Sequence, residues 1–256
     1  MRNIIYNVMF KLYTIGNIKT SGRNLKNEFA SYLDVIFYVL TTGIPWRAIK
    51  GAKLHFTTYH KFFQKLVGLA IFEMTYKILL LTYYKNDPDK IKNLFIDSTM
   101  IRNINGKDNT GKNPSDKNKN GNKITVLVND IGIPISIHLA TANVHDATLI
   151  DATVNSSIIK IIKSRIIGDK GYINPTVKNK LKRTANIKLI YPYRCNQKAK
   201  NTTFEKNLLN KRHIVENFFS WLKRNRRIQQ RYDSKSDNYL NFIYLGLIVI
   251  ISKKIF

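Results

Sequence analysis

The sequence predicts an α/β fold in which a mixed sheet is flanked by helices, with a small helical region at the N-terminal end. Three observations support this class. Short apolar runs typical of strands begin only after residue 90, a hairpin joins two of these runs, and segments with helical spacing alternate with the later ones. The 256 residues, 44% of them hydrophobic, suffice for one large domain or for a medium domain with a small companion.

Helical patterns dominate the N-terminal part. Residues 1–26 are expected to be irregular, because two glycines would interrupt a long helix. Apolar residues then recur at helical spacing over 28–40, and the run Thr-Thr-Gly-Ile-Pro-Trp at 41–46 ends that helix. A second helix is expected over about 58–81. The two helices form either a DNA-binding pair or an ordinary helical hairpin, and we assign 1–90 as an N-terminal helical region with DNA binding as its candidate role.

The pattern changes after a short linker at 86–90. In chain order we expect a strand at 93–101, a polar cationic loop at 105–122, hairpin strands at 123–129 and 133–140, a helix at 146–160, a strand at 164–168, a helix at 175–183, a strand at 187–193, a helix at 208–227 and an apolar tail from 239. Three strands, helix, strand, helix, strand, helix is the order of an RNase H-like α/β domain. We assign this domain to 91–256.

The charge balance predicts a polyanionic partner. Forty-three Lys and Arg residues oppose 16 Asp and Glu, giving a formal net charge of +27. Each cation set against a phosphate releases condensed counterions, so nucleic acid is the first candidate partner. An anionic membrane surface and a ribosome-type structural role are the alternatives.

The sequence shows no sign of export or of a membrane span. The single cysteine, Cys195, excludes an internal disulfide and a multi-cysteine zinc site, and no histidine nearby suggests catalysis. No signal peptide is expected at the start. The most apolar tail segment, 242–251, is half of the about 20 residues that a membrane helix requires. We therefore expect a soluble chain in the cytoplasm, associated with the nucleoid if the host is bacterial.

Two aspartates directly follow apolar strands. Asp97 comes after Leu-Phe-Ile at 94–96, and Asp169 follows Arg-Ile-Ile-Gly at 165–168 and precedes Lys-Gly-Tyr. Carboxylates at strand ends lie at the sheet edge where ligand sites form, and the flanking glycines allow a ligand to approach the backbone. Each aspartate taken alone is equally typical of a turn or cap, as Asp130 is in its hairpin turn.

A third carboxylate, Glu216, comes with a helical pattern of its own. At 100° per residue, Arg212, Glu216 and Lys223 fall within about 40° of one helix face. An exposed ion pair is the ordinary interpretation. The arginines at 224, 226, 227 and 231 favour a phosphate-facing surface instead. Three carboxylates are the natural ligands of two magnesium ions in phosphodiester transfer.

These segments together resemble a known family. LFIDSTMIR at 94–102, IIGDKGYIN at 166–174 and RHIVENFFSWLKRNRRIQQRYD at 212–233 resemble the three acidic motifs of insertion-sequence DDE transposases of the insertion-sequence-five type. The family signature Y-(2)-R-(3)-E-(6)-K is matched at its arginine, glutamate and lysine. Leu209 occupies the position of its tyrosine.

The resemblance implies both a site and a reaction. Asp97, Asp169 and Glu216 would be the catalytic residues and would hold two Mg²⁺ ions, for which Mn²⁺ can substitute. The chain would nick element ends at inverted repeats and join the 3′-hydroxyl to target DNA. It would act as a homodimer bound to double-stranded DNA, and no membrane partner is expected. The predicted DNA contacts are Arg212, Lys223, Arg226, Arg227, Tyr172 and Lys170.

Several alternatives stay open. A decayed or domesticated DNA-binding derivative and a standalone metal-dependent nuclease of the same fold share these motifs. We interpret Asp146 as a helix N-cap beside a loop histidine, His145, rather than as a metal site. Trp46 could contact DNA bases or anchor the helical region to the core, and His138 is expected to be structural.

Overall fold

The structure, a computed structural model, describes residues 2–16, 26–85, 88–114, 116–193 and 200–255. The chain forms two compact units. We call them the helical unit (Met1–Leu79, Ile104–Asp108 and Leu222–Phe256) and the sheet unit (Leu80–Asn103 and Asn109–Trp221). This division differs from the predicted ranges 1–90 and 91–256, because the last part of the chain clusters with the N-terminal helices.

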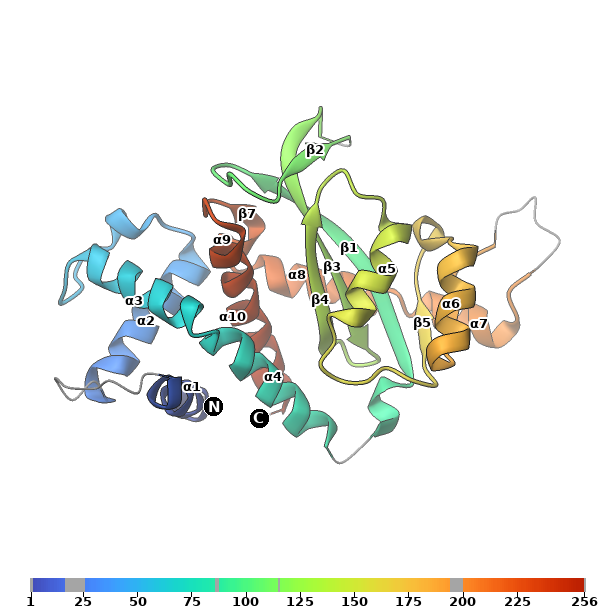
Figure 1. Cartoon of the computed structure of the whole chain (residues 1–256), viewed down its shortest axis with the longest axis horizontal. Helices are drawn as coiled ribbons and strands as arrows, with labels where there is room; N and C mark the ends of the chain where they lie inside the picture. The colour runs from blue at the N-terminus through green and yellow to red at the C-terminus, as the bar shows by residue number, and fades with distance from the viewer. Residues whose placement is uncertain (1, 17–25, 86–87, 115, 194–199, 256) are drawn as a thin grey trace. The chain divides into compact units, whose positions relative to one another are not determined.

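The sheet unit holds a mixed sheet with the strand order β2-β3-β1-β5-β6, in which β4 also pairs with β3 (Figure 1). Its strands are β1 (Asn93–Asn103), β2 (Gly111–Asn113), β3 (Lys119–Asn129), β4 (Pro134–Thr141), β5 (Arg165–Ile167) and β6 (Lys188–Ile190). Strand β3 runs antiparallel to β1 and β4, whereas β5 pairs in parallel with β1 on one side and with β6 on the other. Helix α5 (Asp146–Asn155) packs against β3 and β4, and α6 (Pro175–Ala185) packs against β6. This arrangement confirms the predicted RNase H-like α/β class.

Consecutive burial explains why these segments are strands. Leu94, Phe95 and Ile96 on β1 are all fully buried, as are Ile166 and Ile167 on β5. Neighbouring side chains in a strand point to opposite faces, so both faces of the sheet are covered here. The continuous apolar runs in the sequence reflect this two-sided burial.

The polar segment at 105–122 is not the loop that its composition predicts. Gly111–Asn113 forms strand β2, which pairs with the first residues of β3. The Asn122 side-chain amide also donates to the backbone oxygen of Asn109 over 2.5 Å. Backbone and amide hydrogen bonds, rather than apolar burial, order this segment, so hydropathy alone could not predict it.

The helical unit begins with a helix that the sequence did not predict. Helix α1 (Arg2–Gly16) buries Ile5, Met9 and Tyr13 along one side. Helix α2 (Lys26–Thr42) ends as predicted, because Gly43 adopts a left-handed φ of 71° and its N–H bonds back to Val39.

Two predicted helices are interrupted. The one expected over 58–81 consists of α3 (Phe56–Gly68) and α4 (Ile71–Tyr84), separated where Ala70 has a φ of 52°. The one expected over 208–227 consists of α7 (Thr203–Asn210), α8 (His213–Lys223) and α9 (Arg226–Gln229). The break before α4 directly follows Gly68, the last residue of α3, whereas the breaks at 211–212 and 224–225 contain neither glycine nor proline, which explains why no sequence signal predicted them.

Helix α10 (Ser236–Ile255) is the core helix of the helical unit. It is long and apolar enough to cross a membrane by length and composition, and 61% of that window is buried. A helix that is apolar all round is buried in the core of a protein or in a bilayer, and here Trp46 packs near the Phe242 ring at 6.3 Å between centroids. Trp46 is buried, which supports the anchoring interpretation over DNA contact.

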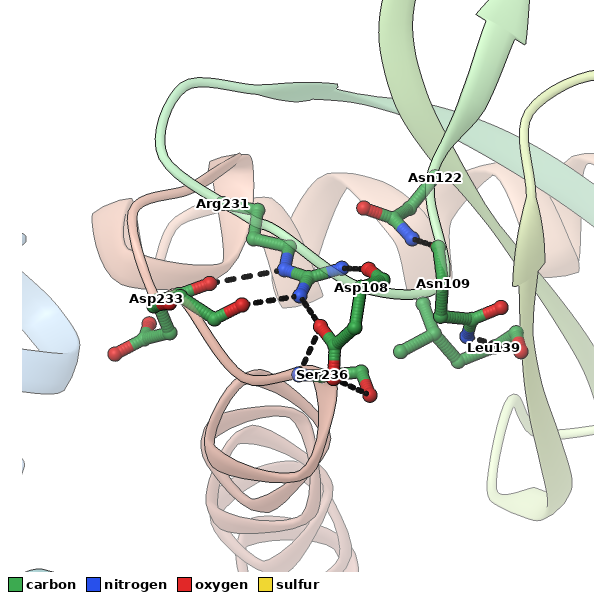
Figure 2. Close-up of polar contacts among 8 residues, drawn as sticks. Asp108, Asn109, Asn122, Leu139, Arg231, Asp233 and Ser236 are labelled. Atoms are coloured by element: carbon green, nitrogen blue, oxygen red, sulfur yellow. Dashed lines mark hydrogen bonds and ion pairs between the residues drawn. The ribbon is translucent and has the colours of Figure 1, made fainter.

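A buried arginine fixes the start of α10. Arg231 is 0% exposed and donates to the backbone oxygens of Asp233, Ser234 and Asp108 and to the Asp108 carboxylate (Figure 2). The same carboxylate accepts hydrogen bonds from the backbone N–H and the hydroxyl of Ser236, at 2.8 and 2.9 Å. The segment Ile104–Asp108 is thereby attached to the helical unit.

Candidate active site beside strands β1 and β5

Asp97 lies within β1, not at its end as the sequence predicted, and Asp169 lies two residues beyond the end of β5. Phe95 of β1 is the register partner of Ile167 of β5, and each aspartate lies two residues beyond its member of this pair. Both aspartates lie just beyond the last residue pair that joins β1 to β5, where β1 continues in its pairing with β3. The structure therefore brings together the two aspartates that the sequence singled out.

A backbone N–H orients each carboxylate. Oδ1 of Asp97 accepts from the N–H of Ser98 at 2.8 Å, and Oδ1 of Asp169 accepts from the N–H of Gly171 at 2.7 Å. On the other side of the Asp97 carboxylate, Nη2 of Arg212 lies 3.8 Å from Oδ2. Asp97 and Asp169 each have one oxygen fixed by the protein backbone.

The Asp97 carboxyl group is hard to ionise in the metal-free protein. Its pKa is raised to about 6, mainly by burial and in smaller part by the nearby carboxylates of Asp169 and Asp146. The Ser98 N–H and the Arg212 guanidinium act in the opposite direction. A bound cation would relieve both the burial cost and the mutual repulsion of these carboxylates.

Tight packing surrounds the second aspartate. A side chain at Gly168 would lie 2.9 Å from the Tyr172 ring and 3.0 Å from Ile96, so only glycine fits there. Tyr172 itself is 1% exposed. Burial raises the pKa of its hydroxyl, and the carboxylates of Asp146 and Asp97 raise that pKa further. A side chain this buried is not free to contact DNA, which corrects the prediction for Tyr172.

A third aspartate belongs to the same cluster, and its predicted role as an N-cap is wrong. His145 is the N-cap of α5, with its Nδ1 accepting from the N–H of Ala147 at 3.2 Å, and Asp146 is the first helical residue. Asp146 instead accepts a hydrogen bond from the Ser98 hydroxyl at 2.6 Å and pairs with Lys123 at 3.0 Å. The available sequence signal was a lysine inside an apolar strand.

Glu216 lies on α8, an amphipathic helix of the sheet unit. Val215, Phe218 and Phe219 are buried, whereas Glu216 is exposed. Arg212 immediately precedes the helix rather than belonging to it, so the predicted continuous face of Arg212, Glu216 and Lys223 begins one residue before α8.

The predicted DNA contacts divide by exposure. Lys170 and Arg226 are exposed, Arg212 and Lys223 are half-buried, and burial lowers the pKa of Lys223. Arg227 is 5% exposed and donates twice to the Asp233 carboxylate, at 3.1 and 2.8 Å. Its side chain is thus committed within the helical unit, which corrects the prediction of a DNA contact by Arg227.

The oxygen donors suit a hard divalent cation, which prefers carboxylates. Asp97 and Asp169 provide such donors, and the raised pKa of Asp97 means that a cation beside it would stabilise its ionised form. Among the described residues, no three His, Cys, Asp or Glu side chains are grouped closely enough to hold a metal ion. Glu216 therefore does not form a preassembled metal site with Asp97 and Asp169 in this structure. Cys195 lies outside the described residues.

Two aspartates beside adjacent parallel strands of a mixed α/β domain can supply oxygen ligands to the divalent ions that assist phosphoryl transfer. Residues 88–251 match the family model described as "Transposase DDE domain". The match covers more than half of the chain, which therefore belongs to this family and is a DDE transposase.

The chain is also similar to individual known proteins. The chain is 29% identical over 154 residues to the transposase assigned to insertion sequence element IS402 of Burkholderia cepacia, covering 57% of this chain and 69% of that protein. The piggyBac transposase synaptic complex with hairpin DNA is similar over 99% of this chain and 66% of its own, with 10% identity and a TM-score of 0.44. The Mos1 transposase paired-end complex with left transposon end is similar over 96% of this chain and 76% of its own, with 13% identity and a TM-score of 0.34.

Proposed function

We propose that this transposase nicks element ends at inverted repeats and joins the freed 3′-hydroxyl to target DNA, with Asp97, Asp169 and Glu216 as the carboxylates that hold divalent metal ions. The observation that carries the proposal is the matched position of Asp97 and Asp169, each two residues beyond the last residue pair that joins β1 to β5. The insertion-sequence-five subtype is part of this proposal.

The residues of the chain have distinct roles in the proposed reaction. Asp97 and Asp169 supply carboxylate oxygens whose orientation is fixed by the N–H groups of Ser98 and Gly171. Glu216 supplies a third, exposed carboxylate. Two bound Mg²⁺ ions, or Mn²⁺ in their place, would neutralise charge on the attacking and leaving oxygens.

The proposed partner is double-stranded DNA, both at the element ends and at the target. The formal charge of +27 supports a polyanionic partner, and exposed cations such as Lys170 and Arg226 are available for phosphates. A homodimer that holds two element ends together, acting in the cytoplasm at the nucleoid, completes the proposal.

The test compares two aspartate-to-asparagine variants on DNA that carries the element end. With Mg²⁺, the parent protein and Asp130→Asn should nick the DNA, whereas Asp97→Asn should bind it without nicking. Asp130 is a matched control because it lies in the β3–β4 turn and accepts only from Asn93 among the contacts described for its side chain. Nicking by Asp97→Asn at the parent rate would contradict the proposed site.

The same assay separates the two alternative functions. Binding without nicking by the parent would identify a DNA-binding derivative, for which Leu209 at the signature tyrosine position is the motivating observation. Nicking without strand joining would identify a nuclease of the same fold.

A further inference from the structure

Lys123 is a charged side chain buried in the middle of the sheet. It lies on β3, where its register partners are Met100 on β1 and Ala140 on β4, and it is 4% exposed. Its ammonium group donates to the backbone oxygen of Val144 at 2.7 Å and pairs with Asp146 at 3.0 Å. A lysine is rarely buried unless it is paired, so Asp146 is the partner that stabilises it.

Asp146 in turn contacts the residues that orient both proposed metal-holding aspartates. Its Oδ1 accepts from the hydroxyl of Ser98, whose own N–H holds Asp97. Its Oδ2 lies 3.7 Å from where a Cβ on Gly171 would sit, and the N–H of Gly171 holds Asp169. The two backbone donors of the site therefore adjoin one carboxylate.

We infer that Asp146, fixed by Lys123, is a positioning residue for the Asp97 and Asp169 carboxylates. It acts through Ser98 and Gly171 rather than on the substrate, and the inference rests on the proposed function of the two aspartates. Side chains that orient metal ligands typically contribute about 10–100-fold to metal affinity. The inference predicts a loss of that size when the link is removed.

The competing explanation is that Asp146 only compensates the buried charge of Lys123. Removing one partner of a buried pair leaves an unpaired charge and destabilises the fold, so single substitutions cannot separate the two explanations. The double variant Lys123→Met/Asp146→Ala removes both charges at once. Ser98→Ala provides a second route, because it cuts the link to Asp97 and leaves the Lys123–Asp146 pair intact.

The experiment measures Mn²⁺ affinity of the DNA-free, full-length protein by electron paramagnetic resonance, with thermal unfolding in parallel. We expect the double variant to unfold near the parent temperature and to bind Mn²⁺ about 10–100-fold more weakly. Ser98→Ala should weaken binding in the same direction with an unchanged unfolding temperature. Thr148→Ala is the matched control, because its hydroxyl bonds only locally to the His145 oxygen in the same first turn of α5, and it should bind as the parent does.

Parent-like Mn²⁺ affinity in the folded double variant would overturn the inference. If the double variant does not fold, Ser98→Ala decides: weaker binding supports the inference, and parent-like binding overturns it. Asp97→Asn, measured in the same way, separates this inference from the proposed function. If Asp97→Asn binds Mn²⁺ as the parent does, the proposed site itself fails. If it loses Mn²⁺ while Ser98→Ala and the double variant retain it, only the role of Asp146 fails.

Discussion

Nη2 of Arg212 lies 3.8 Å from Oδ2 of Asp97, with both side chains only about one-fifth exposed, at 23% and 21%. Arg212 stands one helical turn before Glu216, so the cation beside the first predicted carboxylate and the third predicted carboxylate come from one short segment. The charge of Arg212 favours the ionised form of Asp97.

The first prediction concerns this pair. In Arg212→Gln the Asp97 carboxylate loses an opposite charge, so its pKa should rise further above about 6. The pH at which nicking reaches half its maximum should move upward, and Arg212→Lys should restore most of the shift. A pH–rate profile with Mg²⁺ measures both. An unchanged midpoint in Arg212→Gln would show that the guanidinium does not act on Asp97.

The second prediction is a pH dependence of stability in the metal-free protein. The folded-state pKa of Asp97 is raised from its ordinary value to about 6, mainly by burial, so the folded state holds this proton more tightly than the unfolded state. The contribution to the free energy of unfolding is fully present below about pH 4 and is lost as pH rises through about 6, by up to about 3 kcal/mol. Denaturant unfolding should lose this component in Asp97→Asn. A parent-like pH slope in that variant would rule out Asp97 as its source.

The third prediction concerns the buried arginine at the start of α10. Arg231→Met removes the donors to Asp108, Asp233 and Ser234 and should lower the free energy of unfolding by about 3–5 kcal/mol. Arg226→Met changes an exposed side chain in the same way and should stay within about 0.5 kcal/mol of the parent. Equal effects of the two substitutions in denaturant melts would contradict the assigned role of Arg231.

The fourth prediction concerns DNA affinity. Lys170→Ala removes an exposed cation next to Asp169, so binding should weaken and the slope of log affinity against log salt should fall by about 1. Lys180→Ala is the control, because that ammonium already pairs with Asp151. A salt titration by fluorescence anisotropy distinguishes them. A slope unchanged by Lys170→Ala would remove Lys170 from the interface.

Local patterns predicted the elements that carry the two aspartates. The strands at β1 and β5 follow from apolar runs, and the β3–β4 hairpin follows from its turn residues. The sequence therefore placed Asp97 and Asp169 beside these two strands, but it was wrong to end the first strand at Asp97, which lies within β1. The Asp146–Lys123 pair could not be predicted, because its partners are joined only by sheet register and helix packing.

Charge patterning was a poorer guide than apolar patterning. Arg226 and Arg227 are adjacent and chemically identical, yet one is exposed and the other is buried against Asp233. Which arginine faces solvent depends on how α9 packs against α2 and α10, and a run of like charges contains no such information.

The helical unit is built from three separated stretches of the chain, and this affects when its parts are synthesised. Its core packs α2 and α3 against α10, and α10 follows every residue of the sheet unit in the chain. At about 5–20 residues per second, a ribosome needs a few seconds to add Leu222–Phe256 after the last residue of the sheet unit. The sheet unit with its aspartates is thus fully synthesised before α10, the helix against which α2 and α3 pack.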